Sequence, residues 1–299
     1  MTAGQVAARA EIDGERLDVF VARTAGSRAR AQQWIADGAV TVNGDLVPKR
    51  HLLAVGDHVV MEPPVAAAAP TEIATPDALP VAYEDGDVIV VDKPAGLVVH
   101  PAPGHPTGTL VQMLAGSVEG GDEDWRAGLV HRLDRDTSGL LVLAKSAGVH
   151  ANLKAQLEAR TIERHYVALV DGRPSARTGT IDAPIGRDRR VRTRHSTDTQ
   201  TPREARTHFT LREALPRHSL LDVRLETGRT HQIRVHLEAI GHPVTGDPVY
   251  GKAGALGLDR QFLHAAQLVF DHPRSGERIT LSSPLPPDLA TALERAREA

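Results

Sequence analysis

The pattern of apolar and polar positions divides the chain into two parts. Residues 63–76 are rich in Pro and Ala and keep neither the helical nor the strand period, so we predict an interdomain linker over 63–80. The parts on either side are residues 14–62 and 81–299. Two domains agree with a length of 299 residues, which is long for a single domain.

The first part combines helical and strand patterns. Apolar residues recur at helical spacing twice between residues 16 and 38, which predicts two short helices. Asn43 and Gly44 readily take the positive φ values of a two-residue turn. We therefore predict a hairpin over 40–47 and a further strand over 56–60.

The second part mixes strands and helices. Continuous apolar runs at 88–91, 139–143 and 166–170 are typical of strands that are buried on both faces. Residues 219–225 alternate between apolar and polar, which predicts a half-buried strand. No repeat of solenoid or propeller period is present, so this part is predicted to be α+β.

Two longer helices are predicted in the second part. Ser146 is a suitable N-cap for a helix over 146–160. Another helix follows Thr230, which we predict as its N-cap. The apolar stripe of this helix leaves Arg234 and His236 outside the core-facing positions.

Composition limits the chemistry and the location. The chain has no cysteine, which excludes disulfides, thiolate metal sites and cysteine nucleophiles. No stretch approaches the roughly 20 apolar residues of a membrane span, and the N-terminus lacks the apolar centre of a secretory signal. We therefore expect a cytoplasmic protein without a membrane partner.

The charge balance matters less than the kind of charge. The net charge of −3 by itself argues against a partner as negative as RNA. However, five of the 35 basic residues are lysine and the rest are arginine, the side chain that pairs bidentately with phosphate. Binding to nucleic acid therefore stays compatible with the composition.

The densest polar cluster between two apolar runs is residues 131–138. A loop between two strands is expected at a sheet edge, where side chains can meet a ligand. The cluster holds the carboxylates of Asp134 and Asp136 beside Arg132 and Arg135. A neighbouring guanidinium favours the charged form of a carboxylate, and an ionised aspartate can act as a nucleophile. From the residues by themselves, either aspartate is a candidate.

The order of elements in the first part resembles the alpha-L RNA-binding module, which also occurs in a small-subunit ribosomal protein. The resemblance covers residues 14 to about 62. It implies that Arg28, Arg30 and Lys49 face RNA phosphates and bind substrate. The alternative is that each is an ordinary solvated charge.

The second part resembles the ribosomal large-subunit pseudouridine synthases of the RluA/RluD type, and more closely their RluD-like branch. The signature is His131-Arg132-Leu133-Asp134, followed by Thr137-Ser138-Gly139. A set of ordered blocks is much stronger support than one tetrapeptide. The further matching blocks are 83–85, 91–96, 99–101, 227–236, 241–251, 263–265 and 283–286.

The resemblance implies a role for individual residues. Asp134 matches the catalytic aspartate, while the family's motif leaves the position of Asp136 free. Tyr166 matches the tyrosine that stacks on the target uracil and takes part in proton transfer, and Arg234 matches the arginine that ion-pairs with the aspartate. The expected substrate-binding residues of this domain are Arg132 and Leu263.

The implied function is the conversion of uridine to pseudouridine in large-subunit ribosomal RNA by a monomer with a mixed, largely antiparallel sheet. This isomerisation needs no redox equivalent, so neither a cofactor nor a metal is expected. The histidines fit no usual metal-binding spacing. A basic run at 187–194 either contacts ribosomal RNA or is a solvated loop, and both readings stay open.

Two other functions compete with this interpretation. One is a catalytically inactive RNA-binding or ribosome-assembly protein of the same fold, which the joint presence of Asp134, Tyr166 and Arg234 argues against. The other is a glycoside hydrolase with Asp134 and Asp136 as its carboxylates. Their separation of two residues disfavours it, because hydrolases place two carboxylates on opposite sides of the scissile bond.

Overall fold

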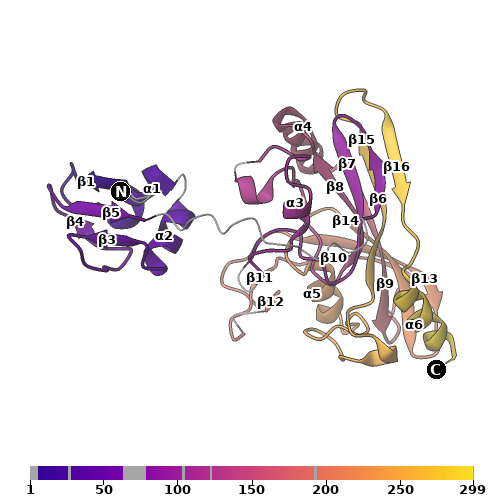
Figure 1. Cartoon of the computed structure of the whole chain (residues 1–299). Coiled ribbons are helices and arrows are strands. Elements are labelled where there is room, and N and C mark those ends of the chain that lie inside the picture. Colours follow the sequence, from indigo (N-terminus) through magenta and orange to yellow (C-terminus); the bar gives the residue numbers. More distant parts are fainter. Residues whose placement is uncertain are drawn as a thin grey trace. The chain divides into compact units, whose positions relative to one another are not determined.

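The computed structural model describes residues 6–25, 28–62, 79–102, 105–121, 123–191 and 194–298. The chain divides into two compact units, Met1–Ala74 and Thr75–Ala299, which Figure 1 colours along the sequence. Residues 63–78, most of the predicted linker, lie outside the described residues. Within the described residues, no helix has the length and apolar character needed to cross a membrane.

The first unit packs two helices against a small sheet. Its elements are β1 (Val6–Arg9), β2 (Glu15–Arg16), α1 (Leu17–Ala25), α2 (Arg28–Ala36), β3 (Val40–Val42), β4 (Leu52–Leu53) and β5 (His58–Met61). β5 lies between β1 and β3 and is antiparallel to both. The apolar residues of α1 and α2 share one core with β3 and β5, so the helical spacing predicted both helices correctly.

The hairpin predicted over 40–47 is correct only at its turn. Asn43 and Gly44 have positive φ values of 53° and 93°, and a single bridge joins Val42 to Asp45. β3 ends there and pairs with β5 instead of with residues 45–47. The strand partner therefore comes from a segment farther along the chain.

The second unit is built on one large sheet. Its elements are β6 (Val81–Glu84), β7 (Val88–Lys93), α3 (Leu110–Met113), η1 (Asp124–Arg126), β8 (Ser138–Ala144), α4 (Ala147–Glu158), β9 (Glu163–Asp171), β10 (Thr178–Asp182), β11 (Gly186–Arg187), β12 (His195–Ser196), β13 (Arg206–Ala214), β14 (His218–Leu225), α5 (Gln232–Ala239), η2 (Ala255–Gly257), β15 (Leu263–Asp271), β16 (Arg278–Ser282) and α6 (Pro287–Glu298).

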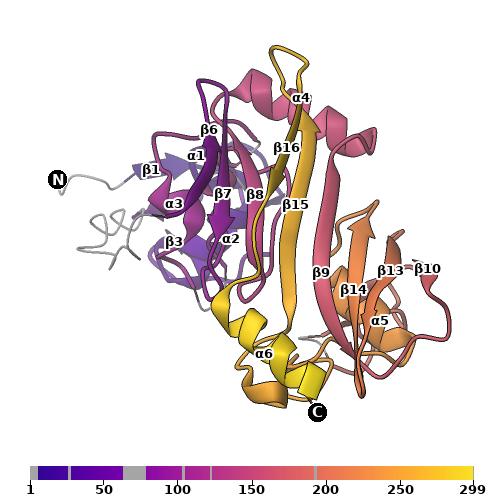
Figure 2. The same cartoon turned by 90° about the vertical axis from the view of Figure 1, so that its right-hand side faces the viewer.

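Nine strands of the described residues form this sheet, in the order β10-β13-β14-β9-β15-β8-β7-β6, with β16 paired to β15. Figure 2 shows β15 and β9 side by side in its centre. Only the pair of β15 and β8 is parallel, and the other pairs are antiparallel. The predicted α+β class with a mixed, largely antiparallel sheet is confirmed.

The continuous apolar runs correspond to strands covered on both faces. Along β8, Leu140 and Val142 pack into one hydrophobic cluster, whereas Leu141 and Leu143 pack into another. α4 contributes to the first cluster, and α5 and α6 contribute to the second. Successive side chains of a strand point to opposite faces, so every residue of such a run is buried.

The two predicted helices differ in how well their ends were placed. Ser146 caps α4 as predicted, and its side chain accepts a hydrogen bond from the Val149 amide. The N-cap of α5 is His231 in the left-handed region, at φ 57°, so the prediction of Thr230 is wrong. The burial prediction for α5 is also wrong, because Arg234 is 4% exposed and His236 is 0% exposed.

Candidate active site

The loop that carries Asp134 leads into an interior strand. It precedes β8, which has β15 on one side and β7 on the other. The expectation of a loop at a sheet edge is therefore wrong. The loop lies where a central strand begins, so its backbone can be held from several neighbouring segments.

Buried polar groups hold the backbone of this loop. The ammonium group of Lys93, which is 0% exposed, donates to three carbonyl oxygens, and the Arg135 carbonyl is one of them at 2.8 Å. Burial lowers the pKa of Lys93 to about 7, although the charges of Asp136 and Asp134 act in the opposite direction. Arg260 donates to the Asp136 carbonyl oxygen at 3.0 Å.

The Asp134 carboxylate pairs with a residue 100 positions away in sequence. Nη1 of Arg234 lies 3.1 Å from Oδ2 of Asp134, as the family resemblance implied. The arginines beside Asp134 in sequence serve other groups. Arg135 pairs with Asp136, and Arg132 lies 3.3 Å from Nε2 of His100.

A second carboxylate, that of Asp247, holds the nitrogens of Arg234 that do not contact Asp134. Nε and Nη2 of Arg234 donate to the two oxygens of Asp247 at 2.6 Å and 2.9 Å, and Asp247 is fully buried. Although burial opposes a charged side chain, the hydrogen bond to Asp247 and the charge of Asp134 raise the pKa of Arg234. Arg234 is therefore a permanent cation that faces Asp134 in a fixed orientation.

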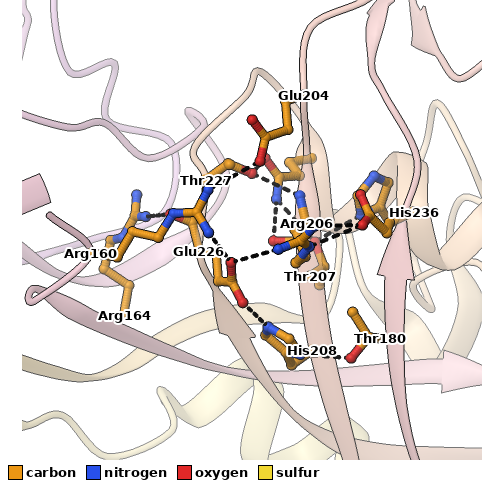
Figure 3. Close-up of polar contacts among 12 residues, drawn as sticks. Arg160, Arg164, Thr180, Glu204, Arg206, Thr207, His208, Glu226, Thr227 and His236 are labelled. Carbon is orange, nitrogen blue, oxygen red and sulfur yellow. Dashed lines mark hydrogen bonds and ion pairs between the residues drawn. The ribbon is translucent and has the colours of Figure 1, made fainter. Parts of the chain in front are cut away.

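Hydrogen bonds from α5 to the sheet set the place of Arg234. The amide group of Gln232 and the ring of His236 both bond the hydroxyl of Thr207 on β13, at 3.0 Å and 2.8 Å. Figure 3 shows His236 and Thr207 within the surrounding polar network. Nε2 of His236 donates to the carbonyl oxygen of Ala183 at 2.8 Å. These hydrogen bonds explain why Gln232 and His236 can be buried although they lie outside the apolar stripe of α5.

Tyr166 and Leu263 lie on adjacent central strands. Tyr166 is on β9 and 5% exposed, and Leu263 is on β15 and 3% exposed. Burial raises the pKa of the Tyr166 phenol, the charge of Arg164 lowers it, and that of Asp134 raises it. Tyr166 therefore lies within the electrostatic range of the Asp134 carboxylate.

Three aromatic residues that surround the pair of Asp134 and Arg234 were given no role in the sequence analysis. The Tyr250 hydroxyl accepts a hydrogen bond from the His195 amide at 3.1 Å and is hydrogen-bonded to Nδ1 of His231 at 3.0 Å. Nε2 of His231 lies 4.0 Å from Oδ2 of Asp134. Tyr250 also lies under the Arg234 guanidinium, 5.0 Å from ring centre to Cζ. Only the motif blocks that contain His231 and Tyr250 could have indicated them.

Two of the predicted RNA-binding residues of the first unit, Arg28 and Lys49, are linked to the acidic side chain of Asp18. Arg28 donates to Asp18 at 3.1 Å, while 52% of its own side chain stays exposed. Lys49 donates to Gln32, and Gln32 donates to Asp18. The side chain of Arg30 lies outside the described residues. Asp18 thus gathers two of the three predicted residues on one surface.

The basic run at 187–194 is partly neutralised. Arg189 pairs with Asp198 at 3.0 Å, and Arg194 pairs with Glu238 of α5 at 2.9 Å. Residues 192 and 193 lie outside the described residues. The segment includes β11 and leads to β12, where His195 contacts Tyr250, so the hairpin of β11 and β12 borders the Asp134 site.

One group of side chains in the described residues has metal-ligand geometry. Ligand atoms of Asp85, Asp87 and His272 lie within 4.8 Å of one another. Arg274 already holds both oxygens of Asp87, and Nε2 of His272 donates to Asp85 at 2.8 Å. Nδ1 of His272 accepts from backbone amides, so its other nitrogen carries the proton. These hydrogen bonds therefore link the turn between β6 and β7 to the turn between β15 and β16.

Comparisons with known protein families match both units. The sequence pattern of RNA pseudouridylate synthases matches residues 87–239, and that of the S4 domain matches residues 15–59. The first pattern spans β7 to α5 and so includes Asp134, Tyr166 and Arg234.

Relatives of similar length extend the match over nearly the whole chain. The uncharacterized RNA pseudouridine synthase YlyB of Bacillus subtilis is 46% identical, with 98% of each chain covered. Ribosomal large subunit pseudouridine synthase D of Pseudomonas aeruginosa is 42% identical, with 97% of this chain and 95% of that protein covered. Human RNA Pseudouridylate Synthase Domain Containing 1 has a similar solved structure, with a TM-score of 0.58 and 26% identity over 74% of this chain and 90% of that one.

Proposed function

The chain belongs to the RNA pseudouridylate synthase family and carries an N-terminal S4 domain, and we propose that it modifies uridines of large-subunit ribosomal RNA with Asp134 as the catalytic group. The activity of the family is an isomerisation of uridine in RNA. The ribosomal substrate is supported by several relatives called ribosomal large subunit pseudouridine synthase D, among them that of Nitrosomonas europaea at 42% identity over 95% of this chain.

The observation that carries the assignment of Asp134 is its ion pair with the doubly anchored Arg234. A carboxylate must be deprotonated to attack the anomeric carbon of ribose, or to take a proton from the sugar while uracil leaves. The Arg234 guanidinium donates a charge-assisted hydrogen bond to Oδ2 of Asp134 at 3.1 Å and so holds this carboxylate in place. Because Asp247 fixes Arg234 and buried groups fix the loop, Asp134 needs little rearrangement to react.

The reaction conserves all atoms. The bond from ribose to N1 of uracil breaks and its electron pair leaves with the base. The detached base turns, C5 forms the new bond to ribose and loses its proton to a base, and N1 takes up a proton, so that the product is an isomer of the substrate. We assign Tyr166 as the aromatic face for the flipped uracil and Leu263 as part of the wall of the base pocket, since both lie on adjacent central strands.

The remaining assignments concern binding. We infer that residues 14–62 form the RNA-binding domain and 81–299 the catalytic domain. Arg28, Arg30 and Lys49 then contact phosphates outside the catalytic centre, and Arg132 contacts RNA beside it. The protein is proposed to act as a monomer in the cytoplasm and to need no cofactor.

The alternative of an inactive RNA-binding protein is disfavoured by this geometry. A chain that had lost the reaction would have no need for a buried carboxylate that holds an arginine against Asp134. Arg234 and Asp247 bury two charges, and buried charges are costly unless they are paired and hydrogen-bonded.

The test compares pseudouridine in ribosomal RNA from cells with the wild-type chain, with Asp134→Asn and with no copy of the protein. Asp134→Asn has a matched control in Asp136→Asn, because Asp136 is a half-buried neighbour that pairs with the exposed Arg135 instead of with Arg234. We expect loss of the same modified positions in the deletion and Asp134→Asn strains, and retention in the control. Unchanged modification in all strains, together with unaltered uridine in RNA treated with purified protein, would refute the proposal.

A further inference from the structure

A buried arginine beside Tyr166 has no acidic partner. Arg164 is on β9, two residues before Tyr166, so both side chains point to the same face of the sheet. Arg164 is 7% exposed. Among the described residues, no carboxylate lies within ion-pair distance of its guanidinium, in contrast to Arg234 with two.

The few neutral contacts of Arg164 do not compensate its charge. Nη2 donates to the Glu226 carbonyl oxygen at 3.3 Å, and buried Nε has no hydrogen-bond partner. Figure 3 shows Arg164 next to Arg160 and Glu226. A Cβ atom on Gly228 would lie 2.8 Å from Nη1, so the guanidinium packs closely against this glycine. Burying an unpaired cation costs stability, and such a cost commonly marks a functional group.

The charge of Arg164 influences the pKa values of groups around Asp134. Burial lowers the pKa of Arg164, and the proximity of Tyr166 acts in the opposite direction. Burial and then the charge of Arg164 lower the pKa of His131, in the Asp134 loop, to about 3. His131 is therefore neutral, so Arg164 carries the positive charge at this place.

In the proposed reaction, negative charge develops on the base that we place against Tyr166, two residues from Arg164 on β9. In the free protein the charge is on the Asp134 carboxylate. When the glycosidic bond breaks, Asp134 becomes neutral, either as an ester with ribose or by taking a proton from the sugar. The electron pair of the bond then makes uracil an anion, delocalised over N1 and the carbonyl oxygens. A fixed cation near the place where charge develops stabilises that state.

We propose that Arg164 supplies the positive charge that stabilises the uracil anion formed during pseudouridine synthesis. The inference rests on the proposed function of Asp134 and Tyr166. It assigns to Arg164 an electrostatic role in the bond-breaking step, rather than a role in holding the fold or in gripping the RNA.

The test uses Arg164→Met, which removes the charge and keeps most of the volume, and Arg160→Met as a control. Arg160 is a nearby exposed arginine that is paired with Glu226 and Glu204. We expect Arg164→Met to lower the single-turnover rate on a bound RNA about 100-fold. Its RNA affinity and the rate of the control should stay within about threefold of wild type. The melting temperature should be unchanged or raised, because an unpaired buried charge is removed.

A more acidic leaving base separates an electrostatic role from a structural one. Fluorine at C5 withdraws electrons, so a 5-fluorouracil anion depends less on a nearby cation. For RNA with 5-fluorouridine at the target, the defect of Arg164→Met in consuming that nucleotide should shrink to about tenfold or less. Arg164→Lys, which keeps the charge, should stay within about tenfold of wild type on the ordinary RNA.

Different results of these assays test the role of Arg164 and the proposed function. Equal defects on both RNAs, a rate within threefold of wild type, or failure of Arg164→Met to fold would each overturn the role of Arg164. In the first two cases an active wild type leaves the proposed function intact. An inactive wild-type protein would instead count against the proposed function itself.

Discussion

Replacing Asp247 by asparagine tests whether the anchoring of Arg234 by Asp247 controls the activity proposed for Asp134. Asp247 is 0% exposed and accepts two charge-assisted hydrogen bonds from Arg234, at 2.6 Å and 2.9 Å. It also accepts from the amides of Val249 and Tyr250 through Oδ1, an atom that asparagine retains. The substitution therefore removes the charge with little change in shape.

Breaking a buried pair by neutralising one partner costs about 3–5 kcal/mol, because the other charge stays buried without compensation. A domain of this size should melt about 10 °C lower for such a loss. Arg234 then has only Asp134 as an acidic partner and can turn away from its fixed orientation. We expect the single-turnover rate to fall about 10- to 100-fold, by analogy with the loss of groups that orient metal ligands.

Urea unfolding and single-turnover assays of Asp247→Asn measure both effects, and Asp136→Asn is the matched control. Asp136 pairs with its exposed neighbour Arg135, so its loss should cost less than about 1 kcal/mol. The reasoning about Arg234 is refuted if Asp247→Asn unfolds at the same urea concentration as wild type and keeps the wild-type rate.

Three further substitutions test the support of the fold. Hydrogen bonds from Arg16, Arg28 and Gln32 outweigh burial and hold the pKa of Asp18 at about 2, below the ordinary 3.8. Its stabilisation of the first unit is therefore complete above pH 3.8 and lost as the pH falls through about 2. Asp18→Asn should cost about 1–2 kcal/mol at neutral pH and remove this acid dependence in urea melts; an unchanged dependence contradicts the assignment. Gly139→Ala places a Cβ 2.3 Å from the Ala265 backbone oxygen at a φ of 111°. It should lower the free energy of unfolding by more than about 4 kcal/mol. A melting temperature near that of wild type would show that this strain is absent. Ser146→Ala should cost about 1 kcal/mol in urea unfolding through loss of the α4 cap, and no change would show that its 3.3 Å bond adds nothing.

Local patterns determined much of the architecture. The apolar runs predicted β7, β8 and β9, because a strand covered on both faces needs apolar residues at every position. The cap at Ser146 was predictable because it depends on atoms only three residues apart. Asp134 was found because its motif is contiguous in sequence.

Periodicity failed where polar residues are buried. His236 and Arg234 were placed outside the core stripe of α5 because polar side chains normally avoid the interior. Their burial depends on Thr207, Ala183 and Asp247, which come from other segments of the chain. No pattern within the helix records those partners.

The sequence by itself determined the family and the class of fold, and it singled out Asp134 as the carboxylate proposed to be catalytic, since these follow from local spacing and contiguous motifs. Only the tertiary structure decided what surrounds that carboxylate. It brings Arg234 across 100 residues to Asp134, fixes it with Asp247, and leaves Arg164 buried without an acid. The physical reason is that the energy of a buried charge depends on partners in space, and the fold, rather than the neighbouring sequence, supplies them.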